Sequence, residues 1–564
     1  MEEVMKEGAY LEGAVPYPQE VAEEYAAKGW WLNQTYGDML DRTVDLHGDT
    51  IAVIDERTSI TFRQLKERVD RLAIAFVRLG IKKYDRMLFQ LPNRHEYIIA
   101  FFAAHRIGAI PTLAVARQEY QEISHFFRLA DPVGWLVPAR DGKRDFRELI
   151  GKIRGEVKNL KYLIVVEDGE ALPDGAFSFR NLLESVSPAD YPSDYLARFR
   201  PDPNDIAVIF TTGGTTGVPK GVPRTHNSFL ASIRTSTQEV LPGDVRALVT
   251  PIGHTMANQG TIGGAMMHGA TVVLLPTSRA KEMLQAIEKY RITDIDLVPT
   301  QLEDLLNSPD LSRYDLSSLK RLITVGAALR PETAERAREF MAKIGGEFGG
   351  GGFGSTEGPS AGKRAKDGLP IPRGAVGLPG CVGDHWKVID ENENELPPGT
   401  EGELVAKGPC VFMGYYRSEA ENKTIFTTDG YYKMGDLGTI DENGYIAITG
   451  RKKDIIQRGG EGIIPKQIED LLHQLPQIER SAVVAMPDPR LGEKACAYVV
   501  LKAGATLTFD EMVQSLKERG AGVLLLPERL EIVEDLPKTE VGKIDKKALV
   551  RAITAKLKGE GALS

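Results

Sequence analysis

Cysteine is scarce in this chain, and long apolar runs are missing. Only three cysteines occur among 564 residues, Cys381, Cys410 and Cys496, and no Cys-x-x-Cys pair or His/Cys cluster accompanies them. Their wide spacing argues against a disulfide framework and against structural zinc. No segment approaches the about eighteen apolar residues of a membrane span, and the acidic N-terminal region lacks the apolar core of a signal peptide. We therefore expect a cytoplasmic protein with no stable membrane insertion.

Positive charge is also not in excess. Lysine and arginine number 70 against 79 acidic residues, and the formal net charge is −9. A broad basic surface for nucleic acid is therefore missing, so nucleic acid is not expected as a partner, and an anionic ligand must be held by a local site. The chain is longer than one hydrophobic core usually organises, which predicts several packed units. We expect a monomer or a homodimer.

Apolar strand-like runs alternate with segments of helical period over most of the chain. Strands are predicted at 51–54, 86–91, 162–166 and 270–275, and helices at 61–79 and 279–290. This alternation predicts an α/β fold with layered parallel sheets. After about residue 374, short strands at 380–389, 402–406, 438–440 and 445–449 predict a small β-rich subdomain. Beyond residue 452 the pattern predicts a small α+β domain, so the domains expected are 1–452 and 453–564.

The segment 210–221, FTTGGTTGVPKG, is the strongest local signal in the sequence. It follows an apolar run that predicts a buried strand, and it presents backbone N–H groups and hydroxyls with little side-chain bulk. Such a loop can hold a polyphosphate, although Gly/Thr-rich turns after strands are also common as plain structure. Because Pro219 precedes Lys220 and Gly221 follows it, the segment does not match the Walker phosphate loop.

Further segments follow this loop in a fixed order: GAAL at 326–329, FGSTE at 353–357, YKMGD at 432–436, GRKKD at 450–454 and PKTEVGK at 537–543. Together they resemble the signature set of the acyl- and aryl-adenylate-forming enzymes, which include acyl-CoA synthetases, nonribosomal adenylation domains and luciferases. The segment 16–25 with the Trp30-Trp31 pair further resembles the 2,3-dihydroxybenzoate-AMP ligase branch. The resemblance thus covers nearly the whole chain.

The resemblance implies a chemistry in which a carboxylate attacks the α-phosphate of ATP and pyrophosphate leaves. Because a carboxylate is ionised at neutral pH, the site must supply positioning and positive charge rather than a base. By their places in the motifs, Lys543 would bridge the two anions, Thr356 would donate a hydrogen bond to the α-phosphate, and Glu357 would hold Mg²⁺. A lysine-rich loop such as the one around Lys543 is otherwise a common solvated charge run.

The resemblance also implies the nucleotide contacts. Asp436 would accept the ribose hydroxyls, Arg451 would contact ribose or phosphate, and Phe353 would offer a ring to adenine. The full set expected to bind ATP or the thiol substrate is Thr212, Gly213, Gly214, Thr215, Thr216, Gly217, Lys220, Gly326, Ala327, Ala328, Phe353, Gly354, Ser355, Thr356, Asp436, Ile448, Arg451, Gly459, Gly460 and Lys543.

The acid pocket is expected around His254, which the resemblance places as a catalytic gate beside the reacting carboxylate. The hydroxybenzoate branch has an asparagine directly after this histidine, whereas this chain has Thr255, which favours a ring with few polar groups. The pocket residues expected are His254, Thr255, Met256, Gly351 and Gly352. The glycine run at 349–352 leaves space for a ring, and Met256 and Met266 would supply apolar walls.

The resemblance implies that the C-terminal domain is mobile and rotates about Lys453. This rotation would replace Lys543 by the Gly459-Gly460 segment, which would line a tunnel for pantetheine. Relatives commonly carry a lysine at the position of Leu525, so a phosphate contact to the thiol substrate is missing here or supplied elsewhere. The chain ends shortly after Lys543 with no carrier domain, so a free acceptor is expected.

We therefore expect an AMP-forming acid–CoA ligase that uses ATP, Mg²⁺ and coenzyme A to activate an aromatic or alicyclic carboxylate. One alternative is a free-standing aryl-acid adenylating enzyme that loads a carrier protein, which the N-terminal resemblance favours and Thr255 disfavours. A second alternative is a nucleotide-sensing pseudoenzyme. The presence of Glu357, Asp436, Arg451 and Lys543 argues against it.

Overall fold

A computed structural model describes residues 10–167, 169, 171–212, 219–326, 329–362, 371–372, 374–459, 461–539, 542–561 and 563. The chain divides into two compact units. Unit 1 comprises Met1–Lys363, Pro379–His385 and Lys407–Phe426, and unit 2 comprises Arg364–Leu378, Trp386–Ala406 and Thr427–Ser564. The predicted boundary between residues 452 and 453 lies inside unit 2 and stays a prediction. Within the described ranges, no helix has the length and apolar character needed to cross a membrane.

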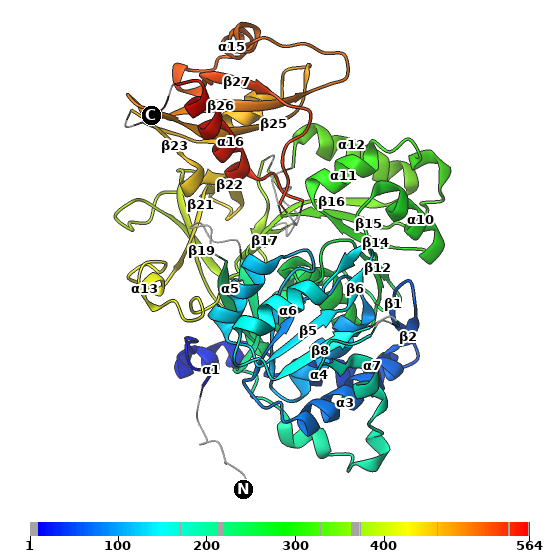
Figure 1. Ribbon diagram of the computed structural model, residues 1–564. Coiled ribbons are helices and arrows are strands. Elements are labelled where there is room, and N and C mark those ends of the chain that lie inside the picture. The colour runs from blue at the N-terminus through cyan, green and yellow to red at the C-terminus, as the bar shows by residue number, and fades with distance from the viewer. Residues whose placement is uncertain are drawn as a thin grey trace. The chain divides into compact units, whose positions relative to one another are not determined.

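Unit 1 contains two large sheets, which confirm the predicted layered α/β architecture (Figure 1). The first sheet runs in the order β18 (Leu378–Pro379), β17 (Ser360–Gly362), β16 (Glu347–Gly354), β15 (Arg321–Val325), β14 (Asp294–Leu297), β12 (Val245–Leu248), β13 (Thr271–Leu274), β1 (Ile51–Ile54) and β2 (Ser59–Thr61). The second runs in the order β11 (Lys220–Thr225), β10 (Ile206–Thr212), β4 (Ile110–Leu113), β3 (Arg86–Phe89), β5 (Gly134–Pro138), β8 (Tyr162–Val166) and β9 (Phe177–Ser178). The inner strands of both sheets pair in parallel, as predicted.

The helices of unit 1 follow the apolar periodicity of the sequence. They are α1 (Gln19–Ala27), α2 (Tyr36–His47), α3 (Phe62–Leu79), α4 (His95–Arg106), α5 (Tyr120–Ala130), α6 (Arg147–Glu156), α7 (Phe179–Glu184), α8 (His226–Ser236), α9 (Gly264–His268), α10 (Ala280–Tyr290), α11 (Pro299–Leu306), α12 (Pro331–Ile344) and α13 (Glu419–Asn422). The bounds of α3 have local causes: Thr61 and Gln64 form a capping box at its start, and Gly80, at φ 91°, ends it in the left-handed conformation.

Unit 2 contains two smaller sheets. The four-stranded sheet runs β19 (His385–Ile389), β20 (Gly402–Lys407), β21 (Tyr432–Ile440) and β22 (Ile446–Arg451). The second runs β24 (Glu461–Ile463), β23 (Ile456–Arg458), β26 (Gly492–Leu501) and β25 (Ile478–Asp488), with β27 (Arg529–Ile532) also paired to β26. Its helices are α14 (Pro465–Leu472), α15 (Phe509–Glu518) and α16 (Lys546–Gly559).

Two predicted strands of the β-rich region differ from the structure. The strand expected at 380–389 begins only at His385, because Asp384 N–H donates to the Cys381 carbonyl at 3.1 Å and closes a turn. The strand expected at 438–440 is longer, since β21 begins at Tyr432. Its pairing with β20 shifts register opposite Gly435, at φ 70°, where a glycine permits the bulge.

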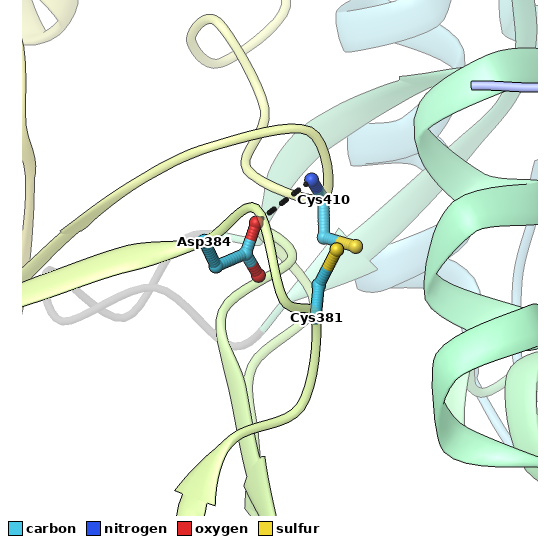
Figure 2. A group of neighbouring side chains, drawn as sticks. All are labelled: Cys381, Asp384 and Cys410. Atoms are coloured by element: carbon cyan, nitrogen blue, oxygen red, sulfur yellow. Dashed lines mark hydrogen bonds between the residues drawn. The ribbon is translucent and has the colours of Figure 1, made fainter. Parts of the chain in front are cut away.

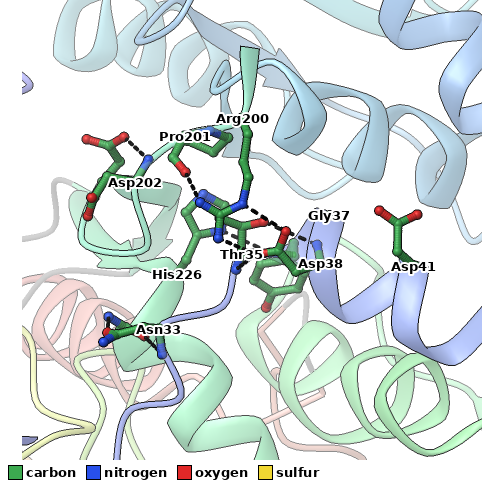
Figure 3. Close-up of polar contacts among 12 residues, drawn as sticks. Asn33, Thr35, Gly37, Asp38, Asp41, Arg200, Pro201, Asp202 and His226 are labelled. Carbon is green, nitrogen blue, oxygen red and sulfur yellow. Dashed lines mark hydrogen bonds and ion pairs between the residues drawn. The ribbon is translucent and has the colours of Figure 1, made fainter. Parts of the chain in front are cut away.

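A polar network ties the start of α2 to the interior of unit 1 (Figure 3). Thr35 and Asp38 form a capping box, and the Arg200 guanidinium donates to both Asp38 carboxylate oxygens at 2.9 and 2.6 Å. The Tyr36 N–H donates to Nδ1 of His226 at 3.2 Å. Because His226 is buried, its pKa lies well below the ordinary value, and its neutral ring can accept this bond.

Acidification is expected to destabilise unit 1 through His226 and its neighbour His105, whose rings lie 5.4 Å apart between centroids. Burial lowers the pKa of His105 to about 4, so both rings stay neutral in the folded protein while the unfolded chain takes up protons below about pH 6.5. The unfolded state then binds more protons, and each histidine costs up to about 1.4 kcal/mol of unfolding free energy per pH unit.

Urea unfolding at pH 7 and pH 5.5, followed by tryptophan fluorescence, checks this expectation. His226→Asn keeps a side-chain acceptor for Tyr36 N–H and should reduce the loss of stability on acidification. His385→Asn, at an exposed position, should leave the loss unchanged. An equal pH dependence in the wild type and His226→Asn would contradict the assignment.

Candidate active site

The loop 213–218 and some other predicted residues fall outside the described residues: Gly213, Gly214, Thr215, Thr216, Gly217, Ala327, Ala328 and Gly460. The flanks of the loop are described. Thr212 and Lys220 are register partners at the ends of the antiparallel strands β10 and β11. Lys220 forms an ion pair with Glu421, and its Nζ lies 4.7 Å from the ring centroid of Tyr415.

Glu357 is a buried carboxylate held in place by two hydroxyl groups. Ser355 Oγ donates to one carboxylate oxygen at 2.9 Å, and the Tyr415 hydroxyl donates to the other at 2.8 Å. The Glu357 carbonyl also accepts the Phe412 N–H at 2.8 Å. Both carboxylate oxygens are therefore oriented before any ligand binds, which suits a metal-binding group.

Thr356 is held from two sides within unit 1. The Thr255 hydroxyl donates to Thr356 Oγ1 at 3.2 Å, and the Arg224 guanidinium donates to the Thr356 carbonyl at 3.1 Å. The structure thus brings a predicted pocket residue and a predicted catalytic residue together. Sequence reasoning missed Arg224 and Tyr415; the available signals were an arginine in the strand after the Gly/Thr loop and the Gly414-Tyr415-Tyr416 sequence.

The segment around His254 is held rigidly by its neighbours. His254 Nδ1 accepts the Met256 N–H at 3.3 Å. The amide of Asn258 donates to the Ile252 and His254 carbonyls at 2.7 and 3.0 Å, and its oxygen accepts the Tyr97 hydroxyl at 3.0 Å. Asn258 is therefore committed to shaping this segment. Met266 is fully buried in α9.

The glycine run 349–352 divides into two pairs with different reasons for glycine. A Cβ on Gly349 would meet Ile323 at 2.6 Å, and Gly350 has φ 62° at an irregularity between β15 and β16. Gly351 would meet nothing within 4 Å, and Gly352 has only ordinary contacts at 3.6 Å and beyond. The structure therefore leaves room for added atoms at Gly351 and Gly352, whereas Gly349 and Gly350 are required by close packing and by backbone conformation.

The remaining residues of β15 and β16 lie at strand ends. Gly326, at φ 92°, follows β15 directly. Phe353 and Gly354 end β16, opposite Ala361 and Ser360 of β17.

Unit 2 contains a second group of predicted site residues. Asp436 and Arg451 are register partners in β21 and β22, and the Arg451 Nε lies 2.8 Å from the buried Asp436 carboxylate. Ile448 pairs with Gly438 on the same two strands. Gly459 has φ 59°, and its N–H donates to the Leu491 carbonyl at 2.8 Å.

Lys543 lies in a short hairpin directly before α16. Its N–H donates to Thr539 Oγ1 at 3.1 Å, and Lys538 and Ile544 form an isolated antiparallel bridge. Burial and the positive charges of Arg451 and Lys453 lower the pKa of Lys543, while Asp436 acts in the opposite direction. Burial and Arg451 also lower the pKa of Lys453. Arg451, Lys453 and Lys543 thus interact electrostatically around the Asp436 carboxylate, an arrangement that would favour an anionic ligand.

Comparisons with known proteins identify the family. Residues 40–416 match the family described as AMP-binding enzyme, and residues 467–543 match the AMP-binding enzyme C-terminal domain. The chain belongs to this family and is an adenylate-forming ligase. The predicted resemblance to the adenylate-forming enzymes and to their 2,3-dihydroxybenzoate-AMP ligase branch is confirmed.

Three relatives show how far the similarity extends. The chain is 32% identical over 551 residues to the 2,3-dihydroxybenzoate-AMP ligase of Bacillus subtilis (strain 168), covering 97% of this chain and 99% of the relative. It is 33% identical over 555 residues to the salicyl-AMP ligase / salicyl-S-ArCP synthetase of Mycobacterium tuberculosis (strain ATCC 25618 / H37Rv), covering 96% and 95%. The apo structure of Mycobacterium smegmatis MbtA superposes with a TM-score of 0.70 at 32% identity, covering 96% and 99%.

These relatives correct one expectation. An acid–CoA ligase for an aromatic or alicyclic acid was predicted, but several curated relatives are named as aryl-acid AMP ligases, and one of these is also named for an ArCP thioester. The prediction of an acid–CoA ligase is therefore wrong. Coenzyme A was preferred as the acceptor because of Thr255 and because no carrier domain follows Lys543. Neither feature identifies the thiol that accepts the acyl group.

Proposed function

We propose that this protein is a free-standing aryl-acid adenylating enzyme that loads a carrier protein. In the first step an aromatic carboxylate attacks the α-phosphate of ATP and displaces pyrophosphate. In the second step a pantetheine thiol on the carrier attacks the acyl carbon and displaces AMP. The observation that carries this proposal is similarity over nearly the whole chain to enzymes named for aryl-AMP formation and, in one case, for transfer to ArCP.

Unit 1 contributes groups suited to the acid and the triphosphate. Mg²⁺ prefers one or two carboxylates together with phosphate oxygens and water, and the single buried, pre-oriented Glu357 fits this preference. When bound there, Mg²⁺ would neutralise charge on the phosphates. Thr356 would donate to the α-phosphate, with Thr255 fixing its hydroxyl, and Lys220 would exchange Glu421 for a phosphate. His254 and Met256 would border the ring, and Gly351 and Gly352 would leave room for it.

Unit 2 contributes groups suited to the ribose and the reacting anions. Asp436 would accept ribose hydroxyls, with Arg451 as its fixed partner. The cations around Asp436 support a role for Lys543 as the bridge between carboxylate and α-phosphate. Lys453 lies in the single turn between β22 and β23. It would be the hinge about which the C-terminal domain rotates, so that the Gly459-Gly460 segment replaces Lys543 at the reacting groups before the thioester forms.

A two-stage assay tests the proposed function. Pyrophosphate exchange with benzoate, salicylate and 2,3-dihydroxybenzoate identifies the activated acid. The enzyme loaded with that acyl-adenylate is then offered a carrier protein bearing pantetheine or, separately, coenzyme A. We expect transfer to the carrier protein. A higher kcat/KM with coenzyme A, or no acid-dependent exchange with any aromatic acid, would overturn the proposal.

A side chain at Gly351 is expected to obstruct the aryl acid without unfolding the protein. A Cβ at this position meets no atom within 4 Å, so Gly351→Val should fold, whereas its methyl groups would enter the space left for the ring. We expect KM for the acid to rise at least about tenfold, as for loss of about 1.4 kcal/mol of binding, with KM for ATP unchanged. Gly151→Val, at an exposed glycine of α6 whose Cβ would also meet no atom within 4 Å, controls for solubility and stability. An unchanged acid KM would place the ring elsewhere.

A further inference from the structure

Two of the three cysteines meet in unit 1, far from each other in sequence. Cys381 begins the turn that ends at Asp384, and Cys410 follows β20. The two sulfur atoms and an Asp384 carboxylate oxygen all lie within 4.8 Å of one another. Figure 2 shows the two thiols pointing toward each other, with Asp384 beside them. Their exposed fractions are 2% for Cys381 and 0% for Cys410.

Neighbouring groups position the two cysteine segments next to each other. The Cys410 N–H donates to Asp384 Oδ1 at 3.1 Å, which joins the two segments beside the sulfurs. Tyr25, Trp31 and Ala231 pack around both cysteines, and the Trp31 indole N–H donates to the Pro409 carbonyl at 2.9 Å. Both thiols are therefore buried beside aromatic rings, with the Asp384 carboxylate next to them.

The two thiols differ in protonation. The Cys410 S–H donates toward Cys381, and the backbone N–H groups of Gly383 and Asp384 add to this, so the pKa of Cys381 is lowered. The same contact and burial raise the pKa of Cys410. Burial, followed by the charge on Cys381, also raises the pKa of Asp384. Of the two thiols, Cys381 is therefore the one that loses its proton more readily.

A metal ion is the other occupant to consider. Structural zinc takes four ligands, whereas the group formed by the described residues offers three, in an aromatic cluster. Asp384 Oδ2 has no hydrogen-bond partner among the described residues, and burial raises the pKa of this carboxyl, which disfavours the ionised form that would serve as a metal ligand. Thiol chemistry therefore fits these contacts better than metal binding.

We propose that Cys381 and Cys410 form a reversible disulfide when the protein meets hydrogen peroxide. The Cys381 thiolate attacks one peroxide oxygen, the O–O bond breaks, and the sulfenic acid forms as water leaves after protonation. The Cys410 sulfur then attacks the Cys381 sulfur, and the second water leaves. Two thiols are oxidised and one peroxide is reduced to two waters, so atoms and electrons balance. A dithiol reductant reverses the bond by exchange.

The disulfide would act on the active-site loop through Cys410. Arg224 donates to the Cys410 carbonyl at 2.7 Å and to the Thr356 carbonyl at 3.1 Å. A Cβ on Gly358 would lie only 1.7 Å from the Cys410 oxygen, so the two backbones are in tight contact next to Glu357. Drawing the sulfurs to a bond of about 2.05 Å shifts Cys410 against this contact. Oxidation should therefore slow adenylation.

The test treats the whole protein with hydrogen peroxide, quenches free thiols and maps peptides without reduction. We expect a linked peptide pair containing Cys381 and Cys410, about a fivefold fall in pyrophosphate exchange, and recovery of both on addition of dithiothreitol. Cys381→Ala should give no linked pair and keep its exchange rate under the same treatment. Cys496→Ala, which removes the buried cysteine of unit 2, should behave like the wild type.

Three results would overturn the proposal: Cys381 and Cys410 recovered as unlinked thiols or separate sulfinic acids, one zinc ion per chain in the purified protein, or a linked pair with unchanged exchange. The exchange readout rests on the proposed function, whereas peptide mapping does not. Absent exchange in the untreated enzyme would count against the proposed function alone, and the linkage would still be decided by the peptides.

Discussion

Replacing Lys543 by alanine is expected to reduce acyl-adenylate formation by several orders of magnitude. In the first half-reaction a carboxylate and a phosphate approach each other, and a cation between them stabilises the transition state by several kcal/mol, with each 1.36 kcal/mol worth a factor of ten. Burial is the main cause of the lowered pKa of Lys543, and the positive charges of Arg451 and Lys453 add to it, so an anionic transition state would find several cations nearby. Pyrophosphate exchange measures this loss.

The second half-reaction separates catalysis from structure. Given pre-made aryl-adenylate and a carrier protein bearing pantetheine, Lys543→Ala should still form thioester at a near-normal rate, because that step begins after phosphate chemistry has ended. Lys538→Ala removes an exposed lysine from the same hairpin and should affect neither step. If both half-reactions fall equally in Lys543→Ala while AMP affinity stays intact, the division of labour between Lys543 and the Gly459 segment is wrong.

The regular elements of this fold could be predicted where local chemistry decides them. The strand predicted at 162–166 is confirmed with the same bounds. A short run of β-branched residues and leucine favours a buried strand. Helix α3 begins one residue after its predicted start because Thr61 serves as the cap rather than as the first turn. The turn at 381–384, closed by the bond from Asp384 N–H to the Cys381 carbonyl, was missed because the Asp384 side chain is also held by the Cys410 N–H, which comes from a distant segment.

In the candidate site, too, local motifs indicated some residues, whereas contacts between distant segments could not be predicted. The motifs indicated Glu357 and Asp436, but no local pattern shows that Tyr415 holds one carboxylate or that Arg451 stands directly opposite the other. Both relations arise from pairing between segments that are separate in sequence. Cys381 and Cys410 also come into contact only through the packing of separate segments. Their spacing in the sequence argued against a disulfide, so their proximity was not predicted.

Replacing Glu357 by glutamine is expected to lower adenylation about a thousandfold and to raise the Mg²⁺ concentration needed for half-maximal activity. An amide has nearly the shape of the carboxylate and keeps hydrogen-bonding capacity toward Ser355 and Tyr415, so the fold should persist. It lacks the charge that holds the metal on the phosphates, a contribution of several kcal/mol. Titration of pyrophosphate exchange with Mg²⁺ measures both effects.

The variant Tyr415→Phe separates orientation of the carboxylate from its charge. It removes one hydrogen bond to an ionised group, worth about 1.5–3 kcal/mol, but leaves the Glu357 carboxylate in place. We expect a loss of about tenfold to a hundredfold with a smaller change in Mg²⁺ dependence than in Glu357→Gln. Calorimetry should show AMP affinity preserved in both variants, because the ribose is assigned to Asp436 in unit 2. An unchanged Mg²⁺ requirement in Glu357→Gln would mean that this carboxylate does not hold the metal and that its contacts with Ser355 and Tyr415 serve only to shape the loop.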